Sequence, residues 1–307
     1  MTYTANGYDG APILNPLQHF GLYQIERVLG AGAVAVVYSA TTPDGRQVAL
    51  KVLNPYAAGQ PKIRQLFRHE YQLASRLRHP GVVQVFDAGE IDSHPFMAMT
   101  LVQGTTLEEY LAANPILGET ASIDIARQVA LTLDYIHQQG ILHRDIKPGN
   151  ILVSRDGRAL LFDFGAALNL NAPPLPGVDG IYGTPAFLAP EQIRNSAEID
   201  GRADLYSLGV VLYRMVAGRK PFYGSRSEVL EAHLHQPPPP PSEFAYVSPE
   251  LEAVILKGLA KDPADRYQTG QELATALEQV KLEPPPERVP LGQRILGWLR
   301  GAPAAST

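Results

Sequence analysis

Two polar motifs joined by a predicted hairpin constrain this chain most strongly. Residues 143–150 read HRDIKPGN, and residues 163–165 read DFG. The interval between them holds two apolar runs, 151–153 and 160–162, on either side of a turn signal at 156–157. Short apolar runs around an Asp-Gly pair predict a hairpin. This hairpin would carry the polar groups of the two motifs at its two ends.

These side chains resemble the catalytic pattern of the protein kinase family, and specifically of the eukaryotic-like Ser/Thr kinases of bacteria. The resemblance implies that Asp145 orients the attacking hydroxyl and accepts its proton, and that Lys147 neutralises the transferring γ-phosphoryl group. It also implies that Asn150 and Asp163 hold magnesium, since hard oxygen ligands suit Mg²⁺. A carboxylate with a reference pKa of about 3.9 is a weak base at neutral pH, so we expect orientation to matter more than basicity.

Strand patterns dominate the first part of the chain and helical patterns dominate the rest. Turn signals between Val-, Ala- and Tyr-rich runs predict three antiparallel strands within 23–53. A helix is predicted over 61–77, and two further strands over 82–87 and 95–101. Beyond Gly104 we expect helices over 106–113, 120–139, 201–217, 226–234, 248–260 and 269–280. A strand-rich part followed by a helix-rich part predicts an α+β fold with two lobes.

The family resemblance covers roughly residues 22–280 and implies the bilobal protein kinase fold. The small N-lobe, 22–102, would hold an antiparallel sheet and one helix. The larger C-lobe, 103–280, would be mostly helical. We expect residues 1–21 to form a loose lead-in, and residues 281–307 a proline-rich tail.

Two proline runs mark segments whose roles the sequence leaves open. The first, Pro237 to Pro241, resembles a polyproline ligand for small recognition domains, but a stiff loop between two helices is the simpler interpretation. The second, Pro284 to Pro286, precedes a short amphipathic segment, 289–299. Two arginines, Arg294 and Arg300, are too few for strong attraction to lipid. This segment could dock on the kinase, touch a membrane surface, bind a regulatory partner or stay weakly ordered. Its apolar residues are Val289, Leu291, Ile295, Leu296, Trp298 and Leu299.

Composition limits location and partners. The chain has 307 residues and a net charge of −5, which favours neither nucleic acid nor an anionic membrane as a bulk partner. It has no cysteine, which excludes disulfides, thiol catalysis and cysteine-ligated metals. It has no run of 18 apolar residues, so we expect no integral membrane segment. Residues 1–6 lack the basic start and apolar core of a signal peptide, and a cytoplasmic protein is the simplest expectation.

A glycine-rich stretch marks the expected nucleotide end of the site. Around Gly30 and Gly32 the chain resembles the kinase glycine-rich loop, whose backbone N–H groups approach phosphate oxygens closely. Ala35 stands where the family has a third glycine. Because alanine has less freedom at positive φ, we expect a stiffer loop and weaker nucleotide binding. The resemblance implies that Lys51, on a strand, grips the α- and β-phosphates, and that Glu70, on the next helix, is its ion-pair partner.

The stretch 95–104 resembles the hinge between kinase lobes. Met99 would guard the back of the adenine pocket. The Thr100 carbonyl and the Val102 N–H would bond the adenine edge. The resemblance also implies a lining around the nucleotide, which we place at Leu29, Val37, Ala49 and Leu152.

The segment after the second motif matches the Ser/Thr-specific form of the family. Lys147 together with Gly183-Thr184-Pro185 is typical of that form, and Thr184 would hydrogen-bond Asp145 and Lys147 and shape the substrate pocket. Three further residues resemble structural residues of the family, namely the buried partners Glu191 and Arg266 and the helix-capping Asp204.

The interval 166–183 departs from the family because it contains no serine or threonine. Relatives are commonly switched on when a phosphate in this loop pairs with the arginine that corresponds to Arg144. We expect that this chain does not need Ser/Thr phosphorylation there, and that Asp179 or Tyr182 occupies the basic site instead. The prolines at 173, 174 and 176 would favour one loop conformation.

The expected function is a Ser/Thr protein kinase that converts ATP and a protein hydroxyl to ADP and a phosphoprotein. Mg²⁺ is the expected metal and Mn²⁺ an alternative. One rival is a pseudokinase scaffold, which predicts the loss of Lys51, Asp145, Asn150 or Asp163, yet all four are present. Another is a small-molecule phosphotransferase, which is not expected to carry the peptide-docking segment 183–191. The sequence identifies neither the physiological substrate nor the activating signal nor the oligomeric state.

Overall fold

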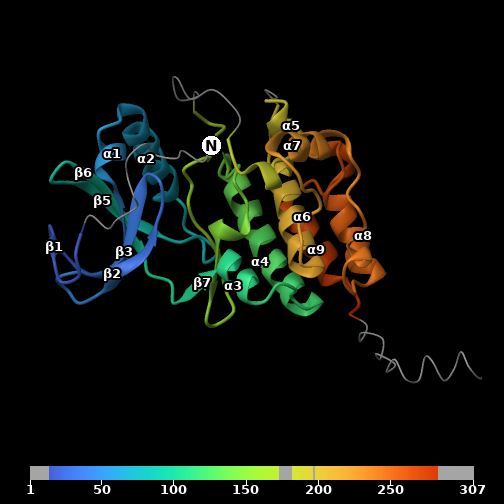
Figure 1. Cartoon of the computed structure of the whole chain (residues 1–307), viewed down its shortest axis with the longest axis horizontal. Coiled ribbons are helices and arrows are strands. Elements are labelled where there is room, and N and C mark those ends of the chain that lie inside the picture. The colour runs from blue at the N-terminus through green and yellow to red at the C-terminus, as the bar shows by residue number, and fades with distance from the viewer. Residues whose placement is uncertain (1–13, 173–181, 196–197, 283–307) are drawn as a thin grey trace, which may run out of the picture.

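The computed structural model describes residues 14–172, 182–195 and 198–282, and these form two lobes (Figure 1). The first lobe is built around a sheet, and the second is mainly helical, so the predicted bilobal α+β architecture is confirmed. Asp179, the loop prolines and the tail segment 289–299 lie outside the described residues. Within the described ranges, no helix combines the length and apolar character needed to cross a membrane.

The N-lobe sheet has six antiparallel strands in the order β1-β2-β3-β4-β6-β5. Their bounds are β1 (His19–Phe20), β2 (Tyr23–Ala31), β3 (Ala35–Thr41), β4 (Gln47–Leu53), β5 (Val85–Ile91) and β6 (His94–Thr100). The strand predicted over 82–87 starts three residues later. Val82 and Val83 instead attach to Leu161 in the C-lobe, through a parallel bridge and an N–H···O bond of 2.9 Å.

The described part of the lead-in, 14–21, packs on the sheet, whereas its composition predicted a loose segment. Leu14 is buried, and its N–H donates to the Tyr38 hydroxyl at 3.2 Å. Phe20 pairs edge-to-face with Phe96, with ring centroids 5.7 Å apart. These contacts cover one face of the sheet, where a small apolar cluster is buried.

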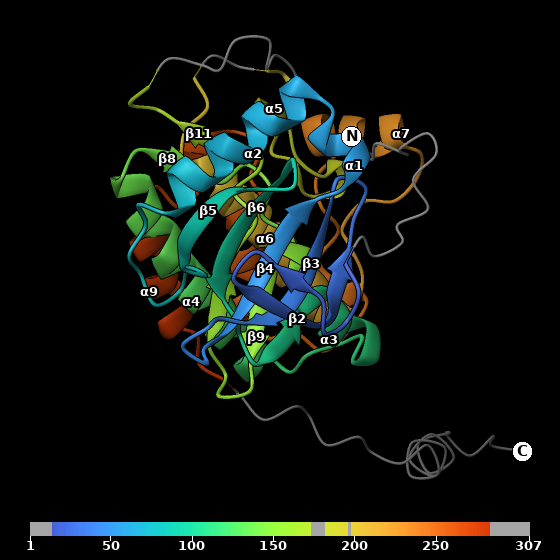
Figure 2. The same cartoon turned by 90° about the vertical axis from the view of Figure 1, so that its left-hand side faces the viewer.

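Two helices flank the N-lobe sheet (Figure 2). Helix α2 (Pro61–Ala74) is the predicted one, and it buries Phe67, Leu73 and also Glu70. The single turn α1 (Pro55–Ala58) starts at an Asn54 cap. Four residues are too few to produce a helical periodicity in the sequence, so no pattern predicted α1.

The C-lobe is arranged around α6, most of whose side chains are buried (Figure 1). The predicted helices are observed with ends that agree to within two residues, and α5 is an additional single turn. Their bounds are α3 (Leu107–Ala113), α4 (Glu119–Gln138), α5 (Pro190–Ile193), α6 (Arg202–Ala217), α7 (Arg226–His235), α8 (Pro249–Gly258) and α9 (Gly270–Glu278). Short 3₁₀ turns occur at Pro148–Asn150, Pro185–Phe187, Pro241–Glu243 and Pro263–Asp265.

Two small sheets cross the C-lobe surface that faces the N-lobe. The predicted hairpin is observed as β9 (Ile151–Ser154) and β10 (Ala159–Leu161), and β7 (Gly104–Thr106) extends it. The strand β8 (Ile141–Leu142) pairs with β11 (Leu168–Asn169) and so ties the segment after the second motif to the end of α4. The hairpin therefore brings both motifs to the boundary between the lobes.

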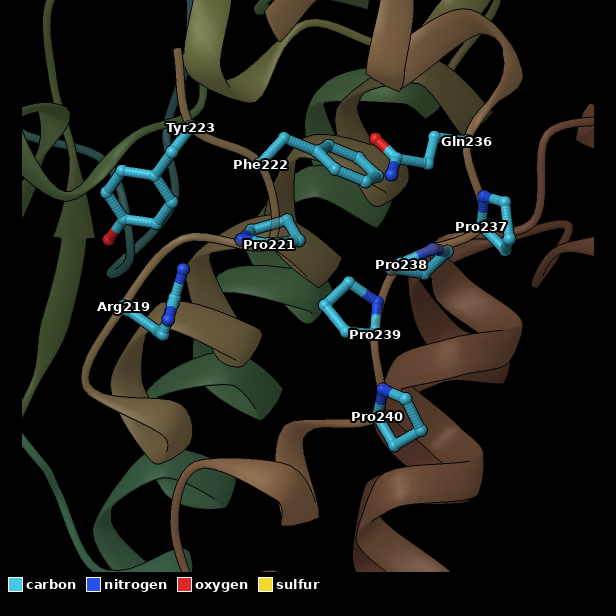
Figure 3. Close-up of a pocket in the computed structure, with 9 residues that line it drawn as sticks. All are labelled: Arg219, Pro221, Phe222, Tyr223, Gln236, Pro237, Pro238, Pro239 and Pro240. Carbon is cyan, nitrogen blue, oxygen red and sulfur yellow. The ribbon is translucent and has the colours of Figure 1, made fainter.

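The proline run 237–241 follows α7 and forms part of a cavity wall (Figure 3). Pro237 to Pro240 face Arg219 and Tyr223 across a cavity of about 530 Å³. Pro241 is buried at the start of a 3₁₀ turn. These positions fit the stiff-loop interpretation of this run.

Candidate active site

The register of the N-lobe sheet places four predicted site residues on one face. Val37 pairs directly with Lys51, and Ala49 pairs directly with Met99. Lys51 and Ala49 are two residues apart on β4, and side chains at that spacing share a face. Val37 and Met99 are partly exposed, while Ala49 is buried. This face is directed toward the boundary between the lobes, as the contact of Lys51 with the C-lobe shows.

The other predicted nucleotide-binding residues border this face. Leu29 lies on β2 and Leu152 on β9, and both are partly exposed. At the end of β6, the Thr100 N–H donates to the Gln84 carbonyl at 2.9 Å. Among the backbone bonds of the described residues, none has the Val102 N–H as its donor.

The glycine-rich turn is closed by a bond from the Gly32 N–H to the Ala35 carbonyl, at 2.9 Å. A side chain added at Gly30 would meet no atom within 4 Å, so this position opens onto free space. Ala35 begins β3, pairs with Leu53, and is buried. Its φ is not positive, so this conformation of the turn does not require glycine at position 35, and the expected stiffer loop stays a prediction.

One ammonium group links the two lobes. Lys51 Nζ donates to both carboxylate oxygens of Glu70, at 2.7 and 2.9 Å, and to Asp163 Oδ1 at 2.9 Å. The Lys51 and Glu70 side chains are only 16% and 8% exposed. The structure therefore brings together β4, α2 and the second motif, as the sequence predicted for the first two.

The charges in this cluster shift one another. Burial lowers the pKa of Lys51, but the carboxylates of Asp163 and Glu70 outweigh burial and raise it overall. Burial raises the pKa of Glu70 to about 7, since Lys51 offsets only part of the cost. The ammonium of Lys51 holds the pKa of Asp163 below its usual range. Asp163 is thus anionic at neutral pH and available as a metal ligand.

A second network surrounds Asp145. Lys147 Nζ donates to Asp145 Oδ2 at 2.7 Å and to Thr184 Oγ1 at 3.0 Å. The backbone N–H and the hydroxyl of Thr184 both donate to Asp145 Oδ1, at 2.8 Å each. Asn150 Nδ2 donates to Asp145 Oδ2 at 3.0 Å. The four residues span the first motif and the segment 183–185, and their contacts agree with the predicted bonding of Thr184.

Asp204 at the start of α6 fixes the backbone of the first motif. Its buried carboxylate accepts from the N–H groups of His143 and Arg144, at 2.9 and 2.8 Å. Arg144 has a φ of 62°, which is unfavourable for a residue other than glycine, so these bonds hold a strained turn. His137 Nε2 also lies 2.8 Å from Asp204. Nothing local in the sequence indicated His137, because 67 residues separate it from its partner.

The second motif turns sharply at Asp163, whose φ is 64°. The ring of Phe164 is buried and packs against His143, with centroids 4.8 Å apart. His143 Nε2 in turn lies 3.2 Å from the Phe162 carbonyl. The inward position of Phe164 leaves the Asp163 carboxylate directed at Lys51.

Arg144 is held by the segment that follows the second motif. Its Nε donates to the Ala166 carbonyl at 2.6 Å, and its guanidinium lies 5.0 Å from the centroid of the Tyr182 ring. Burial lowers the pKa of this guanidinium. Tyr182 thus lies at the basic site, as one of the two predicted occupants.

Glu191 and Arg266 form the buried ion pair that the sequence predicted. Arg266 donates to both carboxylate oxygens, at 2.7 and 2.9 Å. It also donates to the carbonyls of Ala260, Arg202 and Lys261. The pair joins α5 to the turn after α8, and so anchors the chain that follows Gly183-Thr184-Pro185.

The oxygen atoms near the two networks fit a small divalent cation. Asn150 uses Nδ2 to bind Asp145, so its Oδ1 is left as an acceptor. Asp163 uses Oδ1 for Lys51, which leaves Oδ2. One carboxylate and one amide, completed by water and phosphate oxygens, are a typical set for Mg²⁺. Among the described residues no cluster of three His, Cys, Asp or Glu side chains forms a metal site.

Comparison with known proteins decides the family. The sequence model of the protein kinase domain family matches residues 23–277. The chain belongs to the protein kinase family. Within it, the chain is similar to eukaryotic-like Ser/Thr kinases of bacteria.

Two curated relatives and one solved structure illustrate the similarity. The probable serine/threonine-protein kinase PknB of Corynebacterium glutamicum is 38% identical over 268 residues, which cover 83% of this chain and 41% of PknB. PknJ of Mycobacterium tuberculosis is 41% identical over 84% of this chain and 45% of PknJ. The crystal structure of the Mycobacterium tuberculosis PknI kinase domain has a TM-score of 0.68 at 34% identity, over 87% of this chain and 99% of that domain. The chain thus spans less than half the length of these curated kinases and matches nearly all of a kinase domain.

Proposed function

We propose that this chain is an active Ser/Thr protein kinase that transfers the γ-phosphoryl group of ATP to serine and threonine hydroxyls of proteins. The observation that carries this proposal is the position of Asp145. Three side chains, those of Lys147, Thr184 and Asn150, donate hydrogen bonds to its carboxylate. A carboxylate fixed in this way can orient an incoming hydroxyl without losing further conformational entropy of its own during the reaction.

Asp145 would accept the proton as the hydroxyl oxygen attacks phosphorus, and the O–P bond to ADP would break as the new one forms. Lys147, already in contact with Asp145, would offset the negative charge on the transferring group. Thr184 would hold both residues and set the floor of the pocket for the substrate chain. The bond network supports these roles because it positions all three groups before substrate arrives.

Lys51 would bind the α- and β-phosphates from the N-lobe, held in place by Glu70. Asn150 Oδ1 and Asp163 would hold Mg²⁺, with Mn²⁺ as an alternative. When bound, the metal would neutralise charge on the phosphates. The closed contact between Lys51 and Glu70 supports a competent arrangement of the site.

The proposal includes activation that does not depend on Ser/Thr phosphorylation of the interval 166–183. Arg144, which commonly binds a phosphate in relatives, already contacts the Ala166 carbonyl and the Tyr182 ring. The pairing of β11 with β8 holds the start of the segment as well. These contacts, at the described start and end of the interval, support activation without a phosphate beside Arg144.

Transfer of label from γ-labelled ATP to casein, against a panel of small metabolites, tests the proposed substrate class. Label on casein serine and threonine, and none on the metabolites, is the expected result. Mass spectrometry of the kinase over the same time course tests the second part. Activity that rises only as Thr184 or Tyr182 becomes modified would refute independence from loop phosphorylation while leaving the kinase assignment intact.

A further inference from the structure

A groove of about 550 Å³ on the C-lobe lies between α3, the start of α4 and the β9–β10 hairpin. Its apolar lining comes from Tyr110, Leu117, Ile125 and Val153. Tyr110 is 40% exposed, so the groove presents apolar surface to solvent. Its size lies within the range of roughly 300–1,000 Å³ that is usual for ligand sites. None of the residues in the two catalytic networks lines it, so it is a separate surface.

The described chain leaves the C-lobe beside this groove. The last helix, α9, ends at Glu278, whose Oε1 lies 3.4 Å from Arg127 Nη1. The other terminal nitrogen of Arg127 lies 3.2 Å from Asp124 Oδ1, and Asp124 lines the groove. Gln128 lies one turn of α4 after Asp124, and its side chain donates to the Gly157 carbonyl. This bond fixes the β9–β10 hairpin, which forms the opposite wall of the groove. Figures 1 and 2 show the end of α9 and this hairpin at the same lower edge of the molecule.

The chain beyond Leu282 is long enough to return to the groove. Val289 lies seven positions after Leu282, and an extended chain covers up to roughly 3.3–3.6 Å per residue, so this linker reaches about 24 Å. The segment 289–299 that follows carries six apolar side chains within eleven residues. Apolar surface of that density is stabilised by burial. The groove also carries Asp124 on one wall and Arg155 on another, which can pair with Arg294 of the segment and with Glu287 of the linker before it.

We infer that segment 289–299 docks in this groove of its own chain, with Trp298 or its apolar neighbours filling the space beside Tyr110. The inference commits to one occupant among those that the sequence left open. It does not depend on phosphoryl transfer, because it concerns a surface outside the catalytic networks.

Trp298 is the single tryptophan of the chain, so intrinsic fluorescence reports directly on this segment. Docking predicts blue-shifted emission from the full chain, and acrylamide quenching that is several-fold weaker than for a free peptide of residues 283–307. Ala121 is exposed and lines the groove. Ala121→Arg would place a charge there without disturbing the core, and arginine is a good helix former. We expect this variant to shift the emission to the red and to restore quenching to the level of the peptide.

Thr120→Arg is the matched control, because Thr120 is exposed on the same turn of α4 but does not line the groove. This variant should keep the emission and quenching of the wild type, and thermal unfolding of both variants checks that each is folded. Emission from the wild type like that of the free peptide overturns the inference, as does an equal effect of the two arginines. A blue shift that needs added anionic vesicles, or that grows with protein concentration, overturns it in favour of a lipid surface or a second copy.

Discussion

Lys51 Nζ contacts both carboxylate oxygens of Glu70, at 2.7 and 2.9 Å, and this pair joins the middle of the N-lobe sheet to α2. The same ammonium reaches Asp163 in the second motif. The position of α2 therefore determines where the lysine lies relative to the proposed metal ligand. Because three charged groups share this small volume, the removal of one charge should alter both geometry and titration.

Glu70→Gln keeps the size of the side chain and removes its charge. We expect a loss in kcat/KM of roughly 100-fold, since small displacements of a positioning group can cost that much, with the fold retained. Steady-state kinetics at varied ATP concentration measures the effect. Glu90→Gln is the control. Glu90 lies on β5 and forms an exposed ion pair with Arg64, which is on α2 like Glu70. Equal activity of Glu70→Gln and wild type would contradict a positioning role for this pair.

The acid side of the pH–rate profile should depend on Glu70. Burial raises the pKa of Glu70 to about 7, so lowering the pH through that value adds a proton and weakens the attraction to Lys51. We expect kcat/KM of the wild type to fall there, and the profile of Glu70→Gln to lack this limb. The effect of pH on stability has the opposite sign. Between the usual carboxyl pKa and about 7, Glu70 is protonated in the folded state but not in the unfolded state. Its contribution to the free energy of unfolding therefore declines as pH rises through that window. The same acid limb in both proteins would assign it to another group.

The ring of Tyr182 should help to hold Arg144 in place. A cation–π contact contributes about 0.5–2 kcal/mol, so Tyr182→Ala is expected to lower activity roughly 2- to 30-fold. Tyr182→Phe keeps the ring and should retain activity near that of the wild type. The casein assay on both variants measures the difference. Equal losses in the two variants would indicate a need for the hydroxyl or its modification, against activation without loop phosphorylation.

The buried pair of Glu191 and Arg266 should matter for stability. Arg266 is 2% exposed, and its guanidinium binds both oxygens of Glu191. Glu191→Gln leaves a buried cation without its counter-charge, which typically costs about 3–5 kcal/mol. Denaturant unfolding measures the cost. Asp44→Asn is the control, because the Asp44–Arg46 pair is exposed and should leave unfolding unchanged. A cost for Glu191→Gln no larger than for the control would contradict the proposed anchor.

The sequence predicted the elements that depend on local pattern. The residues of the first motif lie within eight positions, so a short loop and the 3₁₀ turn Pro148–Asn150 are enough to bring Asp145, Lys147 and Asn150 together. The hairpin that carries the second motif follows from two short apolar runs on either side of a turn signal. The helices of the C-lobe have periodic apolar faces long enough to recognise. The roles of these residues in the reaction stay predictions, although their positions are now described.

Several contacts and backbone conformations could not be read from the sequence. His137 meets Asp204 across 67 residues, and the attachment of Val83 to Leu161 shortens a predicted strand. Ala35 matches a family glycine in alignment, yet β3 holds it in an ordinary extended conformation. In each case tertiary packing decides the outcome, and neither periodicity nor turn chemistry carries that information.

Label transfer from γ-labelled ATP to casein by the wild type and by Asp145→Asn tests the central claim most directly. Asparagine keeps the shape of the side chain but cannot accept the hydroxyl proton, and proton transfer typically contributes 10²- to 10⁴-fold, so the variant should be slower by about that factor. Binding of ATP, measured separately, should be nearly unchanged. Label on casein serine and threonine with the wild type, and almost none with Asp145→Asn, is the predicted result. Equal transfer by both proteins, or no transfer by the wild type while it still binds ATP, would contradict the account.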